Sequence, residues 1–457
     1  MVTAAILLFE IISLPLVCAA RAEAPASPLP QRLDRLVLDC YPSATEPGTA
    51  VLVMVDGEPV LRKGYGMADL EKGVKVTPDT IFRIASITKQ FTAIAVLQLV
   101  QEGKVSLTDP ITKYVPDFDT QGKTITIENL LTHTSGLFSM TALDDFVSQM
   151  TRDLKPIEVA NLIAGKPLEF EPGSRFKYSN TNYILLGVLI EKISGRTWAE
   201  NIELSIAKPL GLADTRYCRD DALTPRHARG YDQESSGQWV PMMPVSMTQP
   251  YAAGALESTV DDLAKWTQAL ADGKAVDPKL LERAWTPYEP TEPPSDYGYG
   301  WFIRTESGER WIGHNGGMNG FRSAAVWIPE KKVFVAILRN WYDGGAPDIL
   351  LRRLALEAVG RPEPKRVAIT LPAETLDRYV GVYALSPEVK FTISRNGNKL
   401  FAEAAKGSKV EIFAEAENKF FTREGQDVQF SFTMENERAT QLTLRRGGRD
   451  SIAKREK

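Results

Sequence analysis

The chain has 457 residues, of which 43% are hydrophobic, and this is enough for one large globular domain with a smaller second one. Its 54 Lys and Arg residues stand against 58 Asp and Glu residues, which gives a net charge of −4 and a pI near 5.7. This balance excludes an overall basic field for nucleic acid or anionic lipid, so we expect a small-molecule partner.

The N-terminal residues 1–24 are typical of a cleaved secretory signal peptide. An apolar run is followed by small residues that offer Ala-x-Ala cleavage sites ending at Ala22 or Ala24. Glu10 and the absence of an early Lys or Arg also fit an uncleaved anchor, so that alternative stays open. No other run approaches the roughly 18 apolar residues of a membrane span. We therefore expect a periplasmic or secreted protein without stable membrane insertion.

The few cysteines and histidines argue against metal chemistry. Cys18 would leave with the signal peptide, and Cys40 and Cys218 would then either form a disulfide or remain two buried thiols. The three histidines are far apart and show neither HExxH nor paired metal-ligand spacing: His133, His227 and His314. We expect neither a metal nor a cofactor.

Residues 25–360 are predicted to form one α+β domain. It opens with a helix at 29–40 and a β-hairpin at 49–70 around an Asp-Gly turn. Apolar residues at helical spacing then predict a buried helix from Ser86 to a stop at Gly103.

The middle of this domain, to about residue 285, mixes helices with Pro-rich and Gly-rich loops. Strand patterns return afterwards, and a last helix follows them: strands at 297–303, 309–316 and 321–340, and a helix at 346–359. Strands at both ends of the domain around a helical middle predict a layered structure whose sheet joins N-terminal and C-terminal segments.

A Pro-rich linker at 361–372 precedes a predicted all-β domain at 373–457. Short runs of alternating hydrophobicity are broken there by Asn-Gly and Glu-Gly, which is typical of a small antiparallel barrel or sandwich. We expect the basic segment at 445–457 to be a solvated tail.

Ser86 and Lys89 form an SxxK pair at the start of the predicted buried helix. The ordinary explanation of Ser86 is a helix cap, because such pairs arise by chance in long chains. Residues i and i+3 of a helix share a face, however, so the Lys89 amine can lie beside the Ser86 hydroxyl. Burial would lower the pKa of Lys89 and let it act as a base. The helix N-terminus would add backbone N–H donors beside a developing oxyanion.

A second motif, FKYSNTNY, supplies partners for this pair. Tyr178 is suited to exchange protons with the Ser86 oxygen and a leaving group, and Asn180 is suited to orient Lys89 and a substrate carbonyl. Taken alone, the motif also fits a packed tyrosine and a turn asparagine.

A third motif, WIGHNGGMNGF, places His314 before Gly316 and Gly317 between two predicted strands. Glycines there let the backbone approach a ligand closely, and the Gly317 N–H is a candidate oxyanion donor.

In this order and at these distances, SxxK, YxN and HxG resemble the serine β-lactamase and penicillin-binding protein family, in its class C-like branch. Further blocks extend the resemblance over most of residues 35–357: TIFRIASITKQFTA, ITIENLLTHTSGL, FKYSNTNYILLGVLIEKISG, AAGALESTVDDLAKW and GHNGGMNGF. It implies a β-lactamase/transpeptidase-like domain, with an antiparallel sheet flanked by helices and a helical region. The β-domain resembles the lipocalin-like domain often appended to such hydrolases.

The resemblance also implies roles for single residues. Ser86 would be the nucleophile, Lys89 its activator and Tyr178 the proton shuttle, with the backbone of Ser86 and Gly317 as the oxyanion hole. The residues implied to bind substrate are Asn180, His314, Gly316 and Gly317. His133, in HTSG, precedes Tyr178 and is interpreted as structural.

The implied activity is a serine hydrolase that forms an acyl-enzyme with small ester, amide or D-amino-acyl peptide substrates, and β-lactams are candidate covalent ligands. His314 stands where class C β-lactamases have lysine, and a mostly neutral histidine favours weak or absent β-lactamase activity. A class C β-lactamase and a non-catalytic penicillin-binding or sensor protein remain alternatives. An ordinary α/β-hydrolase is disfavoured, because the chain has no GxSxG motif.

Overall fold

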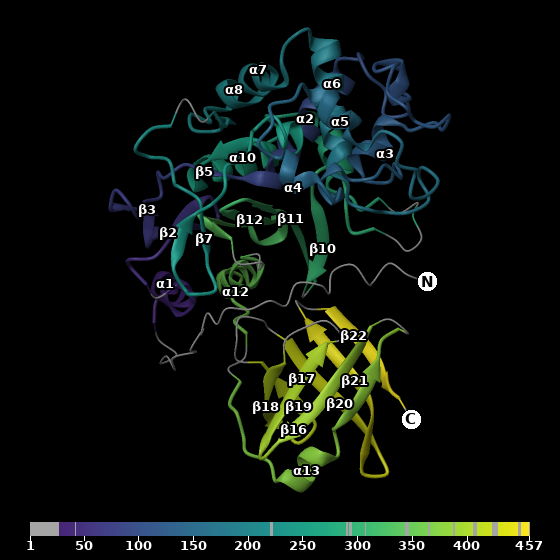
Figure 1. The fold of residues 1–457 in the computed structure, drawn as a ribbon. Helices are drawn as coiled ribbons and strands as arrows, with labels where there is room; N and C mark the ends of the chain where they lie inside the picture. The colour runs from purple at the N-terminus through teal and green to yellow at the C-terminus, as the bar shows by residue number, and fades with distance from the viewer. Residues whose placement is uncertain are drawn as a thin grey trace. The chain divides into compact units, whose positions relative to one another are not determined.

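The computed structural model describes residues 27–456 apart from 42, 220–222, 289–290, 292–294, 307, 343–346, 364–365, 387–388, 405–408, 423–427 and 447–448. The signal peptide predicted at residues 1–24 lies outside the described residues. The chain forms two compact units (Figure 1), of which one spans residues 43–342 and the other combines the N-terminal helix with the chain from 343 onward. The linker predicted at 361–372 falls within the second unit and stays a prediction.

A six-stranded antiparallel sheet forms the base of the first unit. Its strands lie in the order β10 (Phe302–Glu306), β11 (Glu309–Met318), β12 (Phe321–Ile328), β13 (Val333–Arg339), β1 (Thr49–Val55) and β2 (Glu58–Tyr65). The central pair is β1 with β13, in register from Thr49 opposite Arg339 to Val55 opposite Val333. The predicted sheet joining N-terminal and C-terminal segments is therefore confirmed. Every residue of β13 is buried, which explains the unbroken apolar run from Val333 to Leu338 before Arg339 ends the strand.

The strand predicted at 297–303 is wrong over its first part. β10 begins only at Phe302, because Gly300 takes a φ of +89° and turns the chain back, so that Tyr297 forms an isolated bridge with Phe302.

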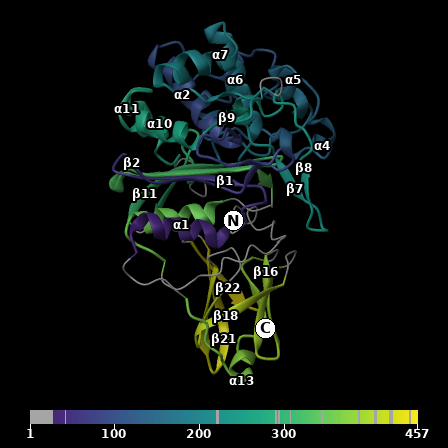
Figure 2. The same cartoon turned by 90° about the vertical axis from the view of Figure 1, so that its left-hand side faces the viewer.

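Helices cover one face of this sheet, as its edge-on view in Figure 2 shows. α10 (Val260–Ala271) packs on β1 and β13, and α2 (Thr88–Gln101) packs against α6 (Asn180–Ser194). Nearly the whole length of α2 and α6 is buried, which explains why both are apolar on all sides. The other helices of this unit are short: α3 (Ile127–Leu131), α4 (Phe146–Gln149), α5 (Pro156–Ala160), α7 (Trp198–Ile202), α8 (Lys208–Leu210), α9 (Tyr251–Gly254) and α11 (Pro278–Ala284).

Short strands complete the first unit: β3 (Met67–Asp69), β4 (Val74–Lys75), β5 (Phe82–Arg83), β6 (Arg216–Tyr217), β7 (Tyr231–Gln233), β8 (Trp239–Pro241), β9 (Leu256–Ser258) and β14 (Trp341–Tyr342). Cys218 lies in this unit as a buried, reduced thiol, so it does not form the disulfide with Cys40 that the sequence left open.

The second unit contains a helix pair and a closed barrel. α1 (Leu29–Cys40) packs on α12 (Asp348–Ala358), with Arg32 Nε 2.6 Å from Glu357 Oε1. After α13 (Ala373–Asp377), eight strands close an antiparallel barrel: β15 (Gly381–Ala384), β16 (Lys390–Asn396), β17 (Lys399–Ala404), β18 (Val410–Ala416), β19 (Lys419–Phe421), β20 (Val428–Glu435), β21 (Arg438–Arg446) and β22 (Arg449–Arg455). Aromatic side chains such as Tyr383, Phe420 and Phe432 are buried in its core.

The solvated tail expected at 445–457 is wrong. Arg449–Arg455 form β22, which pairs with β21 on one side and with β15 on the other and so closes the barrel. Along β22, Asp450, Ile452 and Lys454 are exposed and Ala453 is buried, an alternation that the local composition did not reveal. Within the part of the chain that the structure describes, no helix is long and apolar enough to cross a membrane.

Candidate active site

Ser86 lies in a short 3-10 turn, Ala85–Ile87, that leads directly into α2. Ala85 has a φ of +46°, in the left-handed region that a residue with a side chain adopts only when its surroundings enforce it. One such restraint is the hydroxyl of Ser323, which donates a hydrogen bond of 2.7 Å to the carbonyl oxygen of Ile84. The turn thus holds Ser86 in a fixed and partly exposed position.

Lys89 is fully buried one turn further along α2. Its Nζ lies 3.1 Å from Ser86 Oγ, 2.9 Å from Asn180 Oδ1 and 2.7 Å from the carbonyl oxygen of Ala253. Burial lowers the pKa of Lys89 well below its ordinary value, because desolvation penalises the ammonium form. Lys89 is therefore suited to act as a base.

These three partners determine where the Lys89 lone pair points. A neutral amine has two N–H donors and one lone pair. The Asn180 amide oxygen and the Ala253 carbonyl oxygen can only accept, so they take both N–H groups. The lone pair is left for the Ser86 hydroxyl, which is the arrangement that a general base needs to deprotonate a serine.

Asn180 begins α6 and is held from two sides. Its Nδ2 donates to Thr141 Oγ1 at 3.1 Å, and its backbone N–H donates to Ser139 Oγ at 3.1 Å. Because Nδ2 is engaged by Thr141, the amide oxygen is the atom turned toward Lys89. The structure thus brings Asn180 to Lys89 as the sequence predicted, with both amide atoms bonded within the protein.

Tyr178 places its ring beside the Lys89 amine, 4.9 Å from Nζ to the ring centroid. Its hydroxyl is buried and makes no hydrogen bond to a protein atom. Burial raises the pKa of Tyr178 above its ordinary value, and the nearby Ser86 hydroxyl offsets only part of the rise. A protonated phenol that lacks a protein partner is suited to donate to a substrate or leaving group.

His133 supports the loop that carries Tyr178. Its ring lies 4.2 Å from the Tyr178 ring, centroid to centroid, and its Nδ1 accepts a 3.2 Å hydrogen bond from the backbone N–H of Ser179. Burial lowers the pKa of His133 well below its ordinary value, and Lys89 adds to the effect. A neutral, buried His133 fits the structural role expected from the sequence.

The glycines of β11 allow the strand to reach the Ser86 turn. β10 pairs with β11 only as far as Gly313, and beyond it β11 contacts the turn that carries Ser86. A Cβ on Gly316 would lie 2.4 Å from the Ile84 carbonyl oxygen and 3.0 Å from the Ser86 nitrogen, so only glycine fits there. Gly317 follows as an exposed residue. Gly316 therefore brings the β11 backbone against the Ser86 turn, and the oxyanion role of the Gly317 N–H stays a prediction.

His314 is also brought to the site, but as a buried residue. Its Nε2 lies 3.1 Å from the hydroxyl of Tyr297, and its Nδ1 is bonded to the carbonyl oxygen of Asn315. Nδ1 therefore carries the proton and Nε2 accepts. Burial lowers the pKa of His314 to about 3, so the ring is neutral at pH 7. Both ring nitrogens are engaged within the protein, which the sequence did not predict.

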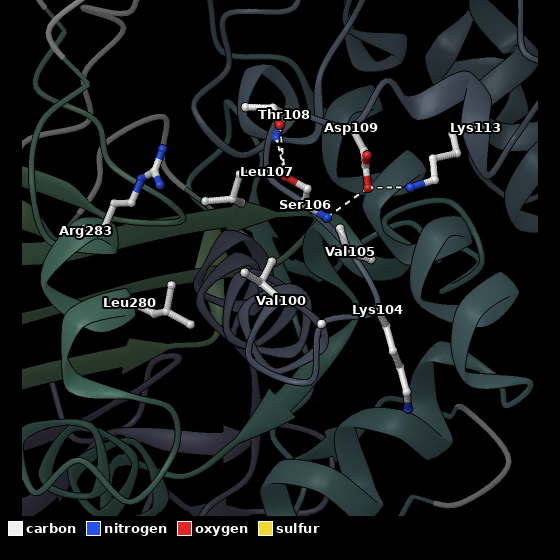
Figure 3. Close-up of a pocket in the computed structure, with 11 residues that line it drawn as sticks. Val100, Lys104, Val105, Ser106, Leu107, Thr108, Asp109, Lys113, Leu280 and Arg283 are labelled. Carbon is white, nitrogen blue, oxygen red and sulfur yellow. Dashed lines mark hydrogen bonds and ion pairs between the residues drawn. The ribbon is translucent and has the colours of Figure 1, made fainter.

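A separate hollow of about 470 Å³ lies at the opposite end of α2 (Figure 3). Its charges are paired: Lys113 Nζ lies 2.9 Å from Asp109 Oδ2, which also accepts a hydrogen bond of 2.6 Å from Tyr114. An α-helix rises about 1.5 Å per residue, which puts Val100 in this hollow roughly 20 Å from Ser86. The hollow is therefore distinct from the Ser86 site.

The first unit, with the Ser86–Lys89 pair at the start of a buried helix, has a β-lactamase-like fold. The β-lactamase family model matches residues 33–360, more than half of the chain, and the chain belongs to this family. Residues 365–454 match a domain of unknown function, DUF3471. The resemblance and the α+β fold class predicted from the sequence are thus confirmed, and the C-terminal domain is a barrel rather than a sandwich.

Two curated relatives illustrate the family. Protein flp of Staphylococcus aureus (strain N315) is 32% identical over 317 residues, which cover 68% of this chain and 63% of the relative. This chain therefore spans less than two thirds of that relative's length. Penicillin-binding protein 4* of Bacillus subtilis (strain 168) is 28% identical over 435 residues, which cover 89% of this chain and 94% of the relative.

Two solved structures are also similar. The octameric penicillin-binding protein homologue from Pyrococcus abyssi has a TM-score of 0.68 and 29% identity, covering 93% of this chain and 99% of its own. The D-amino acid amidase from Ochrobactrum anthropi SV3, complexed with L-phenylalanine amide, has a TM-score of 0.59 and 27% identity, covering 72% of this chain and 96% of its own.

Proposed function

We propose that this protein hydrolyses small D-amino-acyl amides or esters through an acyl-enzyme on Ser86. The observation that carries the proposal is the 3.1 Å contact between Ser86 Oγ and the buried Lys89 amine, whose pKa is lowered. Lys89 takes the hydroxyl proton as Ser86 Oγ attacks the substrate carbonyl carbon, and the backbone N–H groups of Ser86 and Gly317 receive the oxyanion. Tyr178 passes a proton to the leaving amine or alcohol and regains one from the Lys89 ammonium, so both groups return to their starting forms. Water then attacks the acyl ester while Lys89 takes a proton from the water. The Lys89 ammonium returns that proton to Ser86 Oγ as the acid leaves.

Two features support neutral substrates over β-lactams. A neutral, internally bonded His314 provides no cation for a β-lactam carboxylate, whereas a lysine at that position would. The similar fold of a D-amino acid amidase supports amides of D-amino acids as the first substrates to test.

The test is a panel of substrates on purified wild-type protein, with Ser86→Ala as the blank. It contains D-phenylalanine amide and its L-enantiomer, short-chain p-nitrophenyl esters, a D-Ala-D-Ala peptide and a chromogenic cephalosporin. We expect the highest kcat/KM with a D-amide or an ester, and the lowest with the cephalosporin. If the cephalosporin is the best substrate, a class C β-lactamase replaces this proposal.

β-Lactams are proposed as slow covalent ligands of the same serine. Intact-protein mass spectrometry after incubation with a penicillin is expected to show one adduct, located on the Ser86 peptide and hydrolysed slowly. An adduct together with no turnover of any amide or ester would instead favour a non-catalytic penicillin-binding or sensor protein.

Export is part of the proposal, because the N-terminal sequence is typical of a signal peptide. N-terminal sequencing of the protein from fractionated cells is expected to find it in the periplasm or medium, starting after Ala22 or Ala24. A cytoplasmic protein that retains residues 1–24 would contradict this location.

A further inference from the structure

The Ala253 carbonyl that contacts Lys89 comes from a strained turn. Tyr251, the first residue of α9, has a φ of +36°, which a bulky residue adopts only under constraint. The next two carbonyl groups both turn to α2: Ala252 O accepts from Thr92 Oγ1 at 2.7 Å, and Ala253 O accepts from Lys89 Nζ at 2.7 Å. The geometry of this turn therefore sets one of the two acceptors that orient the Lys89 amine.

The side chain of Tyr251 is anchored on α6. Its hydroxyl donates a 2.6 Å hydrogen bond to Glu191 Oε1, and the same oxygen accepts from the backbone N–H of Trp198 at 2.9 Å. The ring lies so close to Gly187 that a Cβ there would be 2.4 Å from it. Burial, and then the hydrogen bond to Glu191, raise the pKa of Tyr251, so its hydroxyl stays a donor.

We propose that Glu191 and Tyr251 are positioning residues for the reaction, because their hydrogen bond holds the strained turn that aims the Ala253 carbonyl at Lys89. The inference rests on the proposed function of Ser86 and Lys89. It gives α6 two tasks: Asn180 at its N-terminal end supplies one acceptor for the Lys89 amine, and Glu191, three turns later, holds the other in place.

Loss of the Tyr251–Glu191 hydrogen bond is expected to change the pKa of Lys89. An ammonium group donates three hydrogen bonds and a neutral amine two, so losing the Ala253 acceptor disfavours the charged form more. The pKa of Lys89 then falls further, and the acid limb of the pH–rate profile moves to lower pH. The rate at the plateau falls as well, since the lone pair is less well aimed at Ser86 Oγ.

Other titratable side chains face Lys89 and belong in the comparison. The rings of Tyr178 and Tyr183 lie 4.9 and 5.5 Å from Nζ, and the pKa values of His133 and His314 respond to the Lys89 charge. All four remain in the variants below, so a difference between pH profiles reports Lys89.

The experiment measures the pH dependence of kcat/KM for the best substrate, and of Ser86 labelling by a fluorophosphonate, in full-length Tyr251→Phe. We expect kcat to fall about tenfold with KM within about twofold, and the acid limb to shift to lower pH. Glu191→Gln keeps an oxygen that can accept from Tyr251 and is expected to retain most activity, whereas Glu191→Leu is expected to behave like Tyr251→Phe. Tyr114→Phe is the matched control, because it removes another 2.6 Å Tyr–carboxylate hydrogen bond in the separate hollow.

Labelling separates two kinds of failure. A folded wild-type protein that neither reacts with the fluorophosphonate at Ser86 nor turns over a substrate contradicts the proposed function, and the inference falls with it. A reactive wild type whose Tyr251→Phe variant keeps its acid limb overturns the inference alone. The same conclusion holds if activity falls only in proportion to the unfolded fraction seen by circular dichroism.

Discussion

Lys89 Nζ lies 3.1 Å from Ser86 Oγ, and both residues belong to the same helical beginning, three positions apart. An amine rather than an imidazole is thus the candidate base beside the proposed nucleophile. Lys89 can act as a base at pH 7 only if it is neutral, and it is neutral only because it is buried. An exposed lysine is protonated at that pH. The site therefore needs the apolar helix pair α2 and α6 around it as much as it needs the SxxK motif.

Ser86→Ala is expected to lower kcat on the order of 10⁴-fold or more, since it removes the atom that forms the covalent intermediate. The melting temperature should stay within a few degrees of wild type, because the turn is held by main-chain and Ser323 contacts. Steady-state kinetics and thermal unfolding check both parts. Wild-type activity in Ser86→Ala would remove Ser86 from the mechanism.

Lys89→Arg is expected to be nearly inactive although it keeps a positive charge. Guanidinium cannot give up its proton at working pH, so it cannot serve as the base. Wild-type activity should fall as the pH drops through the lowered pKa of Lys89, since protonation fills the lone pair. Substantial turnover by Lys89→Arg would show that only charge is required.

Asn180→Asp is expected to move the acid limb of the pH–rate profile to higher pH. A carboxylate in place of the amide oxygen, 2.9 Å from Lys89 Nζ, stabilises the ammonium form and raises the pKa of Lys89. Activity at pH 7 should fall at least tenfold, which corresponds to a loss of about 1.4 kcal/mol or more in transition-state stabilisation. It should recover in part at pH 9. An acid limb that stays in place would mean that Asn180 does not control Lys89 ionisation.

Gly316→Ala is expected to abolish activity with a loss of stability of a few kcal/mol, because its Cβ would lie 2.4 Å from the Ile84 carbonyl oxygen and 3.0 Å from the Ser86 nitrogen. Gly317→Ala is the comparison: its Cβ would meet the guanidinium end of Arg322, which can move. It should keep far more activity, measured as ester hydrolysis and urea unfolding. Equal damage in both variants would contradict the close approach of Gly316 to the nucleophile turn.

His314 is expected to make the protein less stable in acid. Its pKa is about 3 in the folded state against 6.5 unfolded, so the unfolded state binds the proton first. The contribution of neutral His314 to the free energy of unfolding is therefore present above pH 6.5 and is lost as the pH falls toward 3. Between pH 6.5 and 5, wild type should lose about 1.6 kcal/mol more than His314→Gln, because the slope reaches about 1.4 kcal/mol per pH unit only well below pH 6.5. Urea unfolding at both pH values checks this, and an equal loss would contradict the burial of a neutral His314.

Local patterns in the sequence were sufficient to predict much of the fold. The Asp-Gly turn predicts the β1–β2 hairpin, and apolar residues at helical spacing predict α2. Period-two runs predict the barrel strands up to β21. These elements depend on contacts within a few residues, and such contacts leave a record in local sequence. The SxxK, YxN and HxG motifs identified Ser86, Lys89 and Asn180 through the family resemblance instead, because Lys89 and Asn180 stand 91 positions apart in the chain.

Only the tertiary structure showed how distant segments complete these features. β22 closes the barrel through pairing with β15, some seventy residues earlier, so its polar local sequence carried no signal. The Ala253 carbonyl orients Lys89 through a backbone atom that every residue possesses. His314 is neutral because burial lowers its pKa, and Tyr297 occupies its second nitrogen. In each case the deciding contact joins segments far apart in the chain, and its energy depends on their packing rather than on residue type.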